Sequence, residues 1–92
     1  MSVDRVRRRV VVHGRVQGVF FRDAVRRRAV SQGVAGWICN RDDGAVEAVL
    51  EGQPHAVEHL LEFFRRGPRQ AEVEDVQVGE EPPEGLTGFE VR

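Results

Sequence analysis

The sequence predicts an α+β protein in which two helices cover one face of an antiparallel β-sheet. The chain has 92 residues, 40% of them hydrophobic and 32% charged, which predicts one globular domain over residues 1–92. Apolar and polar residues alternate in several short stretches, the period of a strand with one buried face. Two longer segments carry apolar residues every three to four positions, the period of an amphipathic helix.

The first third of the chain predicts a strand, a loop and a helix. Residues 5–13 are rich in valine and predict the strand. Two glycines punctuate the next five residues, 14–18, and predict a loop. Apolar residues at every fourth position predict a helix over 21–32, and Gly33 suits its C-terminal cap.

A hairpin and a second helix follow. Residues 34–41 and 45–51 predict two strands, joined by the turn Asp42-Asp43-Gly44. Residues 54–65 predict the second helix, which begins with a proline, a residue favoured in the first helical turn. An apolar stripe along this helix predicts that one side of it packs on the sheet.

The end of the chain predicts one more strand and a short tail. Residues 71–78 predict the strand, with a bulge because the valines change phase along it. Residues 80–88 predict a polar loop, and residues 89–92 a last short strand. The resulting β-α-β-β-α-β order predicts a two-layer sandwich of the ferredoxin-like, split βαβ type. This fold hosts many activities, so it does not give the function.

The charges are unevenly distributed. All fourteen basic residues are arginines, and the absence of lysine excludes Schiff-base chemistry and a P-loop lysine. Residues 1–46 contain ten arginines and four acidic residues, whereas residues 47–92 contain four arginines and eleven acidic residues. This asymmetry favours an anionic ligand. We expect the arginine runs at 7–9 and 26–28 to form solvated faces, with an ion pair from Asp23 to Arg27 one turn later.

The cellular location is predicted from three features: membrane spans, a secretory signal and cysteines. No apolar run approaches the roughly 18 residues of a membrane span. Arginines near the N-terminus take the place of the apolar core of a secretory signal. The single cysteine, Cys39, cannot form an intramolecular disulfide, so a cytoplasmic protein is expected.

Two other groups of residues are weaker candidates for chemistry. His55 and His59 lie four positions apart on the second predicted helix, but opposite its apolar stripe and without a third metal ligand. We expect them to be solvated and predict no metal site. Cys39 has no histidine obviously placed to activate it, so we expect a half-buried strand residue.

The strongest candidate site is the segment from Gly14 to Arg22. It joins a predicted strand to the start of a helix, and its two glycines allow consecutive main-chain N–H groups to curl around an anion. The helix start adds unpaired N–H groups, and Arg22 can hold two oxygens of one phosphate. The alternative is a plain glycine-rich connection with a surface arginine.

Two motifs resemble those of the acylphosphatase family. The string V-H-G-R-V-Q-G-V-F-F-R at 12–22 resembles the family's signature loop. The second signature, within 36–52, is matched by Gly36, Trp37, Asn40, Gly44, Val46 and Gly52. The sequence departs from the family pattern at Ile38, Cys39 and Arg41, which puts rate and substrate preference in doubt but not the two catalytic positions.

The resemblance implies metal-independent hydrolysis of an acyl phosphate to a carboxylate and phosphate, with no cofactor and no phosphoenzyme. It implies that Arg22 fixes the phosphoryl group and that Asn40 orients the attacking water. The 14–20 loop would hold the phosphoryl group through its main-chain amides, which belong to Arg15, Val16, Gln17, Gly18, Val19 and Phe20. Phosphate or a similar anion such as sulfate is then expected as product or inhibitor, and the protein is expected to act as a monomer.

Two alternatives remain. One is a non-catalytic or accessory acylphosphatase-like domain, such as those that begin larger hydrogenase-maturation carbamoyltransferases; a free-standing enzyme is expected because nothing follows residue 92. The other is an RNA-binding domain, which can share the same element order. Residues 45–51 contain no aromatic side chain for base stacking and carry two glutamates, so no nucleic-acid partner is predicted.

Overall fold

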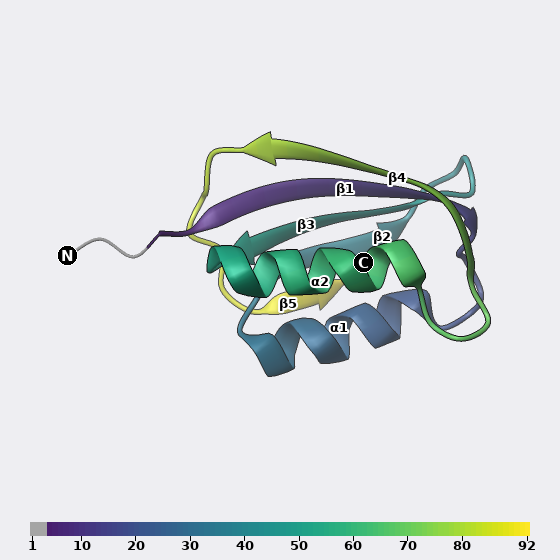
Figure 1. Cartoon of the computed structure of the whole chain (residues 1–92), viewed down its shortest axis with the longest axis horizontal. Coiled ribbons are helices and arrows are strands. Elements are labelled where there is room, and N and C mark those ends of the chain that lie inside the picture. Colours follow the sequence, from purple (N-terminus) through teal and green to yellow (C-terminus); the bar gives the residue numbers. More distant parts are fainter. Residues whose placement is uncertain (1–3) are drawn as a thin grey trace.

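The computed structural model describes residues 4–92, which form strands and helices in the order β-α-β-β-α-β-β (Figure 1). The elements are β1 (Val6–Arg15), α1 (Phe21–Gln32), β2 (Ala35–Asn40), β3 (Val46–Gly52), α2 (Pro54–Arg66), β4 (Glu72–Glu81) and β5 (Phe89–Val91). All the predicted elements are present, and the helices begin where the sequence predicts.

The strands form one sheet in the order β4-β1-β3-β2-β5. Both helices lie on the same face of this sheet, so the predicted ferredoxin-like sandwich is confirmed (Figure 1). One detail differs from the expected antiparallel sheet. The first four strands pair antiparallel, but β5 pairs parallel with β2. The reason is that the chain after β4 crosses to the opposite edge, where it runs in the same direction as β2.

The pairing of β1 with β4 contains a β-bulge. His13 pairs with Asp75 and Gly14 with Val73, so one residue of β4 is left over and the predicted bulge is confirmed. Beyond the bulge the two strands continue to pair. β1 therefore extends to Arg15, two residues past its predicted end, and β4 extends to Glu81.

Gly14 serves a different purpose from the predicted one. It belongs to β1 and has a φ of 127°, which disfavours other residues. A Cβ atom at this position would overlap the main-chain oxygen of Glu72 in β4. Glycine is therefore required here by the close approach of two strands, and the loop itself starts only after Arg15.

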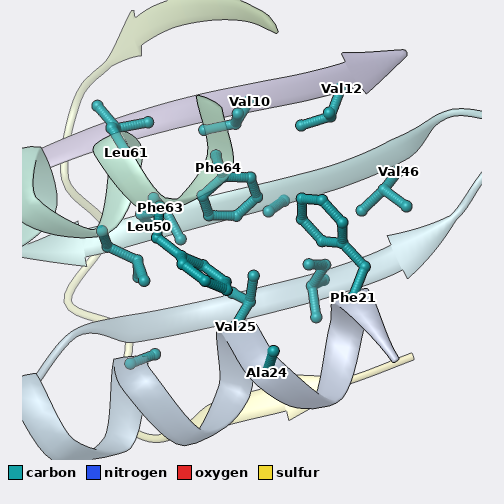
Figure 2. Close-up of a cluster of buried hydrophobic side chains, with 14 of the residues drawn as sticks. Val10, Val12, Phe21, Ala24, Val25, Val46, Leu50, Leu61, Phe63 and Phe64 are labelled. Atoms are coloured by element: carbon teal, nitrogen blue, oxygen red, sulfur yellow. The ribbon is translucent and has the colours of Figure 1, made fainter. Parts of the chain in front are cut away.

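The core lies between the sheet and the two helices. Phe21 from the start of α1 packs against Phe64 and Phe63 of α2, with ring centroids 5.8 and 6.4 Å apart (Figure 2). Phe21 is 1% exposed, so the first turn of α1 is anchored in the core. This fixes the backbone that carries Arg22, the next residue.

The other face of the sheet carries a network of charges. Arg7 is only 5% exposed and donates to Glu51 of β3 and Glu81 of β4 at 2.9 and 2.8 Å. Arg9 donates to Glu81 and to Glu47, both at 2.6 Å. The prediction that this run of arginines is solvated is therefore wrong for Arg7, because distant glutamates on both neighbouring strands neutralise it.

The second arginine run behaves as predicted. Residues 26–28 are exposed on α1, and Arg27 pairs with Asp23 at 3.2 Å. Neither helix in the described part of the chain has the length and apolar character needed to cross a membrane.

Candidate active site

A surface cavity of about 490 Å³ lies where the β1–α1 loop, the start of α1, the end of β2 and the end of β5 meet. It is lined by Val16, Gly18, Phe20, Phe21, Arg22, Asp23, Arg26, Asn40 and Val91. The cavity therefore brings together the loop, the arginine and the asparagine singled out in the sequence, although these residues lie up to 24 positions apart in the chain.

The loop offers the cavity main-chain polar groups rather than side-chain ones. Val16, Gly18 and Phe20 line it, and none of these side chains has a polar atom. Val16 and Val19 are buried in the core, and their packing holds the loop in place at two positions. The hydrogen-bonding groups that the loop presents at the cavity are therefore its N–H and C=O groups.

Phe20 begins α1 in an unusual conformation. Its φ of 60° and ψ of 23° lie in the left-handed region, which is uncommon for an aromatic residue. Its carbonyl oxygen accepts the first helical bond, from the N–H of Ala24 at 3.0 Å. No side chain caps the helix, so the N–H groups of its first turn are left for another acceptor.

Arg22 lies in that first turn and is half-buried at the cavity wall. Its Nη1 donates to the main-chain oxygen of Arg92 at 2.8 Å. A guanidinium has five N–H donors, so this bond orients the side chain and leaves donors for an anion. The segment that follows β5 therefore helps to position Arg22.

Asn40 is the last residue of β2 and is exposed at the cavity. The turn that follows it is tightly bonded. The N–H of Arg41 donates to the oxygen of Ala45 at 2.8 Å, and the Asp43 carboxylate accepts from the N–H of Ala45 at 3.1 Å and from Arg41 at 2.9 Å. The hydrogen bond from Ala45 and the contact with Arg41 lower the pKa of Asp43, outweighing its partial desolvation. The turn therefore holds the end of β2 in place.

Gln17 has a role that its sequence position did not reveal. Its side-chain amide donates to the main-chain oxygens of Arg41 and Ala45, at 2.8 and 2.9 Å. These bonds tie the loop directly to the turn after Asn40. Gln17 therefore links the loop that lines one side of the cavity to the hairpin that carries Asn40. The sequence alone does not reveal these bonds, because they form only when the hairpin of β2 and β3 has folded beside the loop.

Arg15, the first residue expected to bind substrate, directs its side chain elsewhere. Its Nη2 donates to the main-chain oxygen of Gln70 at 2.8 Å, and its backbone still pairs with Glu72 in β4. Three of the six expected binding residues, Val16, Gly18 and Phe20, line the cavity. The other three, Arg15, Gln17 and Val19, have side chains that contact the protein instead.

The departures from the family pattern differ in their surroundings. Ile38 is fully buried in the core, while Cys39 is a half-buried strand residue, as predicted. Arg41 pairs with Asp43 in the turn. None of the three lines the cavity.

The two histidines considered as a possible metal pair do not line this cavity. His55 and His59 are both exposed on α2. Among residues 4–92, no group of three or more histidine, cysteine, aspartate or glutamate side chains has an arrangement that could hold a metal ion.

Comparison with known proteins identifies the family. The acylphosphatase family profile matches residues 8–91. An acylphosphatase from Gloeobacter violaceus is 57% identical over 86 residues, which cover 94% of this chain and 92% of that protein.

Solved structures agree with the sequence relatives. An acylphosphatase from Coxiella burnetii superposes with a TM-score of 0.92 and 38% identity, covering 97% of this chain and 94% of that one. The acylphosphatase from Bacillus subtilis gives a TM-score of 0.91 and 39% identity, with 95% and 98% coverage. By sequence, length and fold, the chain belongs to the acylphosphatase family, whose members are hydrolases acting on acyl phosphates.

Proposed function

We propose that the cavity is the active site and that the loop amides of residues 16–20 together with Arg22 hold the phosphoryl group, while Asn40 orients the attacking water. The observation that carries this proposal is that the loop, Arg22 and Asn40 line one cavity although they come from separate elements. The left-handed start of α1 supports it, because unpaired N–H groups at a helix start favour an anion.

The reaction breaks the bond between phosphorus and the acyl oxygen. Water adds to phosphorus, the bonding electron pair leaves with the carboxylate, and both protons of the water end on the phosphate product. The leaving carboxylate has a conjugate acid of pKa about 4, so it departs without a general acid. The protein therefore has to supply positioning and charge stabilisation, which are the main requirements of phosphoryl transfer.

The residues at the cavity suit these two tasks. Arg22 and main-chain donors can neutralise the phosphoryl oxygens as charge develops on them. Asn40 offers a carbonyl oxygen that can accept a hydrogen bond from water without adding negative charge beside the phosphate. The reaction as proposed needs no metal or cofactor.

Several broader features complete the proposal. We infer one domain acting as a monomer, since the loop, Arg22 and Asn40 already meet at a cavity within a single copy of the chain. Inorganic phosphate, as product, and similar anions such as sulfate would inhibit by occupying the same donors. The single cysteine supports a cytoplasmic location. Nucleic acid is not proposed as a partner, because β3 carries no aromatic residue and has Glu47 and Glu51.

The test is release of phosphate from acetyl phosphate and benzoyl phosphate by the purified protein, with a metal chelator present. We expect turnover that persists with chelator and is lost in Arg22→Ala. Turnover that needs an added metal, or survives in Arg22→Ala, would contradict the proposed site. Binding of phosphate without turnover would favour the alternative of a non-catalytic acyl-phosphate-binding or accessory domain.

A further inference from the structure

We propose that Phe20, together with Val91, forms an apolar rim that binds the acyl half of the substrate and makes the enzyme favour acyl phosphates with aromatic or large apolar acyl groups. The proposal rests on the proposed active site. It adds a selectivity that phosphate binding alone cannot provide, because every acyl phosphate carries the same phosphoryl group.

Phe20 is exposed where its neighbours are buried. Its side chain is 77% exposed, whereas Val19 and Phe21 on either side are within the core. Single exposed apolar residues are common on proteins. This one, however, lies at the wall of the cavity that contains Arg22.

The backbone at Phe20 adds a second observation. An aromatic residue in the left-handed region is strained, and glycine at the same position would not be. The ring recovers none of this by burial, since it is mostly exposed. Strained residues of this kind cluster at functional sites, where the strain is offset by what the residue does for a ligand.

Val91 brings a second apolar side chain to the same cavity. It lies in β5 opposite Ile38 of β2, two residues before Asn40, and is 41% exposed. The rim is therefore built from two segments that are far apart in the sequence. Because Phe20 and Val91 line the same cavity as Arg22, an acyl group attached to the bound phosphate lies within the space that they border.

The charged residues at the cavity do not favour a charged acyl group. Besides Arg22, only Asp23 and Arg26 carry formal charge among its lining residues, and their charges are opposite. Asp23 is also paired with Arg27. The apolar side chains are therefore the main feature available to distinguish one acyl group from another.

The experiment compares kcat/KM for benzoyl phosphate and acetyl phosphate in the wild type, Phe20→Ala, Phe20→Gly and Val91→Ala. We expect the wild type to favour benzoyl phosphate, and both Phe20 variants to lower the benzoyl-to-acetyl ratio about threefold to tenfold, as expected for loss of an aromatic contact. Val91→Ala should lower the ratio about twofold, because only two methyl groups are lost. Val30→Ala removes a 60% exposed valine of α1 that does not line the cavity, and should leave the ratio unchanged.

Phe20→Gly separates ligand binding from a structural role. Glycine tolerates the left-handed conformation, so the melting temperature of this variant should not fall more than about 3 °C below that of the wild type, while the ratio falls. A ratio within about twofold of wild type in both Phe20 variants, or a wild-type preference for acetyl phosphate, overturns the inference but leaves the proposed function standing. Failure of the wild type to hydrolyse either substrate overturns both.

Discussion

Two places in this molecule combine main-chain N–H groups with an arginine: one surrounds a buried carboxylate, and the other is the proposed phosphate site. In the Glu51 cradle, the buried Glu51 carboxylate accepts hydrogen bonds from the N–H groups of Glu84, Gly85 and Leu86, at 2.8, 3.0 and 3.0 Å, and from Arg7 at 2.9 Å. At the candidate active site, the loop at 16–20 and Arg22 offer the same kinds of donor.

The two sites differ in the surroundings of the arginine. Arg7 is buried between Glu51 and Glu81, whereas Arg22 lies at a cavity wall and is held by a main-chain oxygen of Arg92. An internal carboxylate bound in this way stabilises the fold. The same donors facing a cavity can bind an anion from solution. The difference teaches that donor type alone does not distinguish a structural site from a candidate binding site; the exposure of the arginine and its partner have to be considered as well.

The Glu51 cradle also supports the active site indirectly. It holds the segment 84–86, which leads into β5, and Arg92 after β5 orients Arg22. Burial raises the pKa of the Glu51 carboxyl, but the hydrogen bonds from Glu84, Arg7, Leu86 and Gly85 outweigh burial and lower it to about 2.

The largest expected effect is on the cavity arginine. Arg22→Ala should lower kcat/KM by at least about 10³-fold, because an arginine on a transferring phosphoryl group contributes that much or more. Its stability should change little, since the bond lost is exposed. Steady-state kinetics and urea unfolding measure both. Arg27→Ala, on the same helix and paired with Asp23, is the matched control and should keep normal activity. Comparable losses in the two variants would contradict the role of Arg22.

Removing the arginine of the Glu51 cradle should instead lower the stability of the fold, which the Arg22 substitution should leave almost unchanged. Arg7→Ala leaves the buried Glu51 carboxylate with only the more distant Arg5 as a cation, at 3.7 Å, and should cost about 3–5 kcal/mol of unfolding free energy. Urea unfolding checks this. Arg8→Ala is the control, because Arg8 donates only to the main-chain oxygen of Arg7, at 3.1 Å, and approaches the exposed Glu80 at 3.9 Å; it should cost about 1 kcal/mol or less. If the two variants were equally stable, the Glu51 cradle would not have the stabilising role assigned to it.

Glu51 should also give the protein a specific acid sensitivity. Because the folded pKa of about 2 lies below the ordinary value of 4.5, the unfolded chain takes up this proton at a higher pH than the folded one. The stabilisation is therefore complete above about pH 4.5 and is lost as the pH falls towards 2, by roughly 3 kcal/mol. Unfolding free energies measured from pH 6 to pH 2 test this. Glu51→Gln should lack this part of the pH dependence, and an identical pH profile in that variant would rule the assignment out.

Asn40 has no counterpart in the Glu51 cradle, because that cradle binds an internal carboxylate and no water has to be oriented there. Asn40→Ala should lower kcat about 10²-fold, the usual effect of removing one group that stabilises or positions reactants, while phosphate inhibition persists. Asn40→Asp should lower kcat and also weaken phosphate inhibition, since it adds a negative charge at the same place. Loss of phosphate inhibition in Asn40→Ala with unchanged kcat would instead make Asn40 a ligand-holding residue.

Gln17 should show the smallest effect. Removing its two hydrogen bonds to the turn in Gln17→Ala should cost about 1–2 kcal/mol and lower kcat/KM about tenfold, through loss of alignment between the loop and Asn40. Gln77→Ala, at an exposed site in β4, is the control for kinetics and unfolding. A Gln17 variant with the same activity and stability as this control would mean that the link does not matter.

Local patterns in the sequence were enough to predict the elements and the arrangement around the core. The buried stripe of α1, with Phe21 at its start, follows from apolar spacing alone. The left-handed Gly33 that ends this helix was also predictable, because glycine is favoured at that position. The residues proposed for catalysis followed from a glycine-rich segment before a helix and from the family resemblance. The cavity brings those residues together.

The features that were missed depend on contacts between distant segments. The burial of Arg7 requires glutamates at 51 and 81, and no local pattern reveals that pairing. Gly14 looked like a loop residue because its close contact with Glu72 arises only when β1 and β4 pair. The parallel pairing of β5 depends in the same way on where the 82–88 crossing ends.

The most direct test of the account is a titration of the wild type with inorganic phosphate, followed by the amide signals of the NMR spectrum. The account predicts saturable shifts centred on the amides of residues 16–20 and the first turn of α1. It predicts the same shifts in Asn40→Ala and their loss in Arg22→Ala. Shifts centred elsewhere, or unchanged binding in Arg22→Ala, would contradict the claim that this loop and Arg22 form the phosphate site.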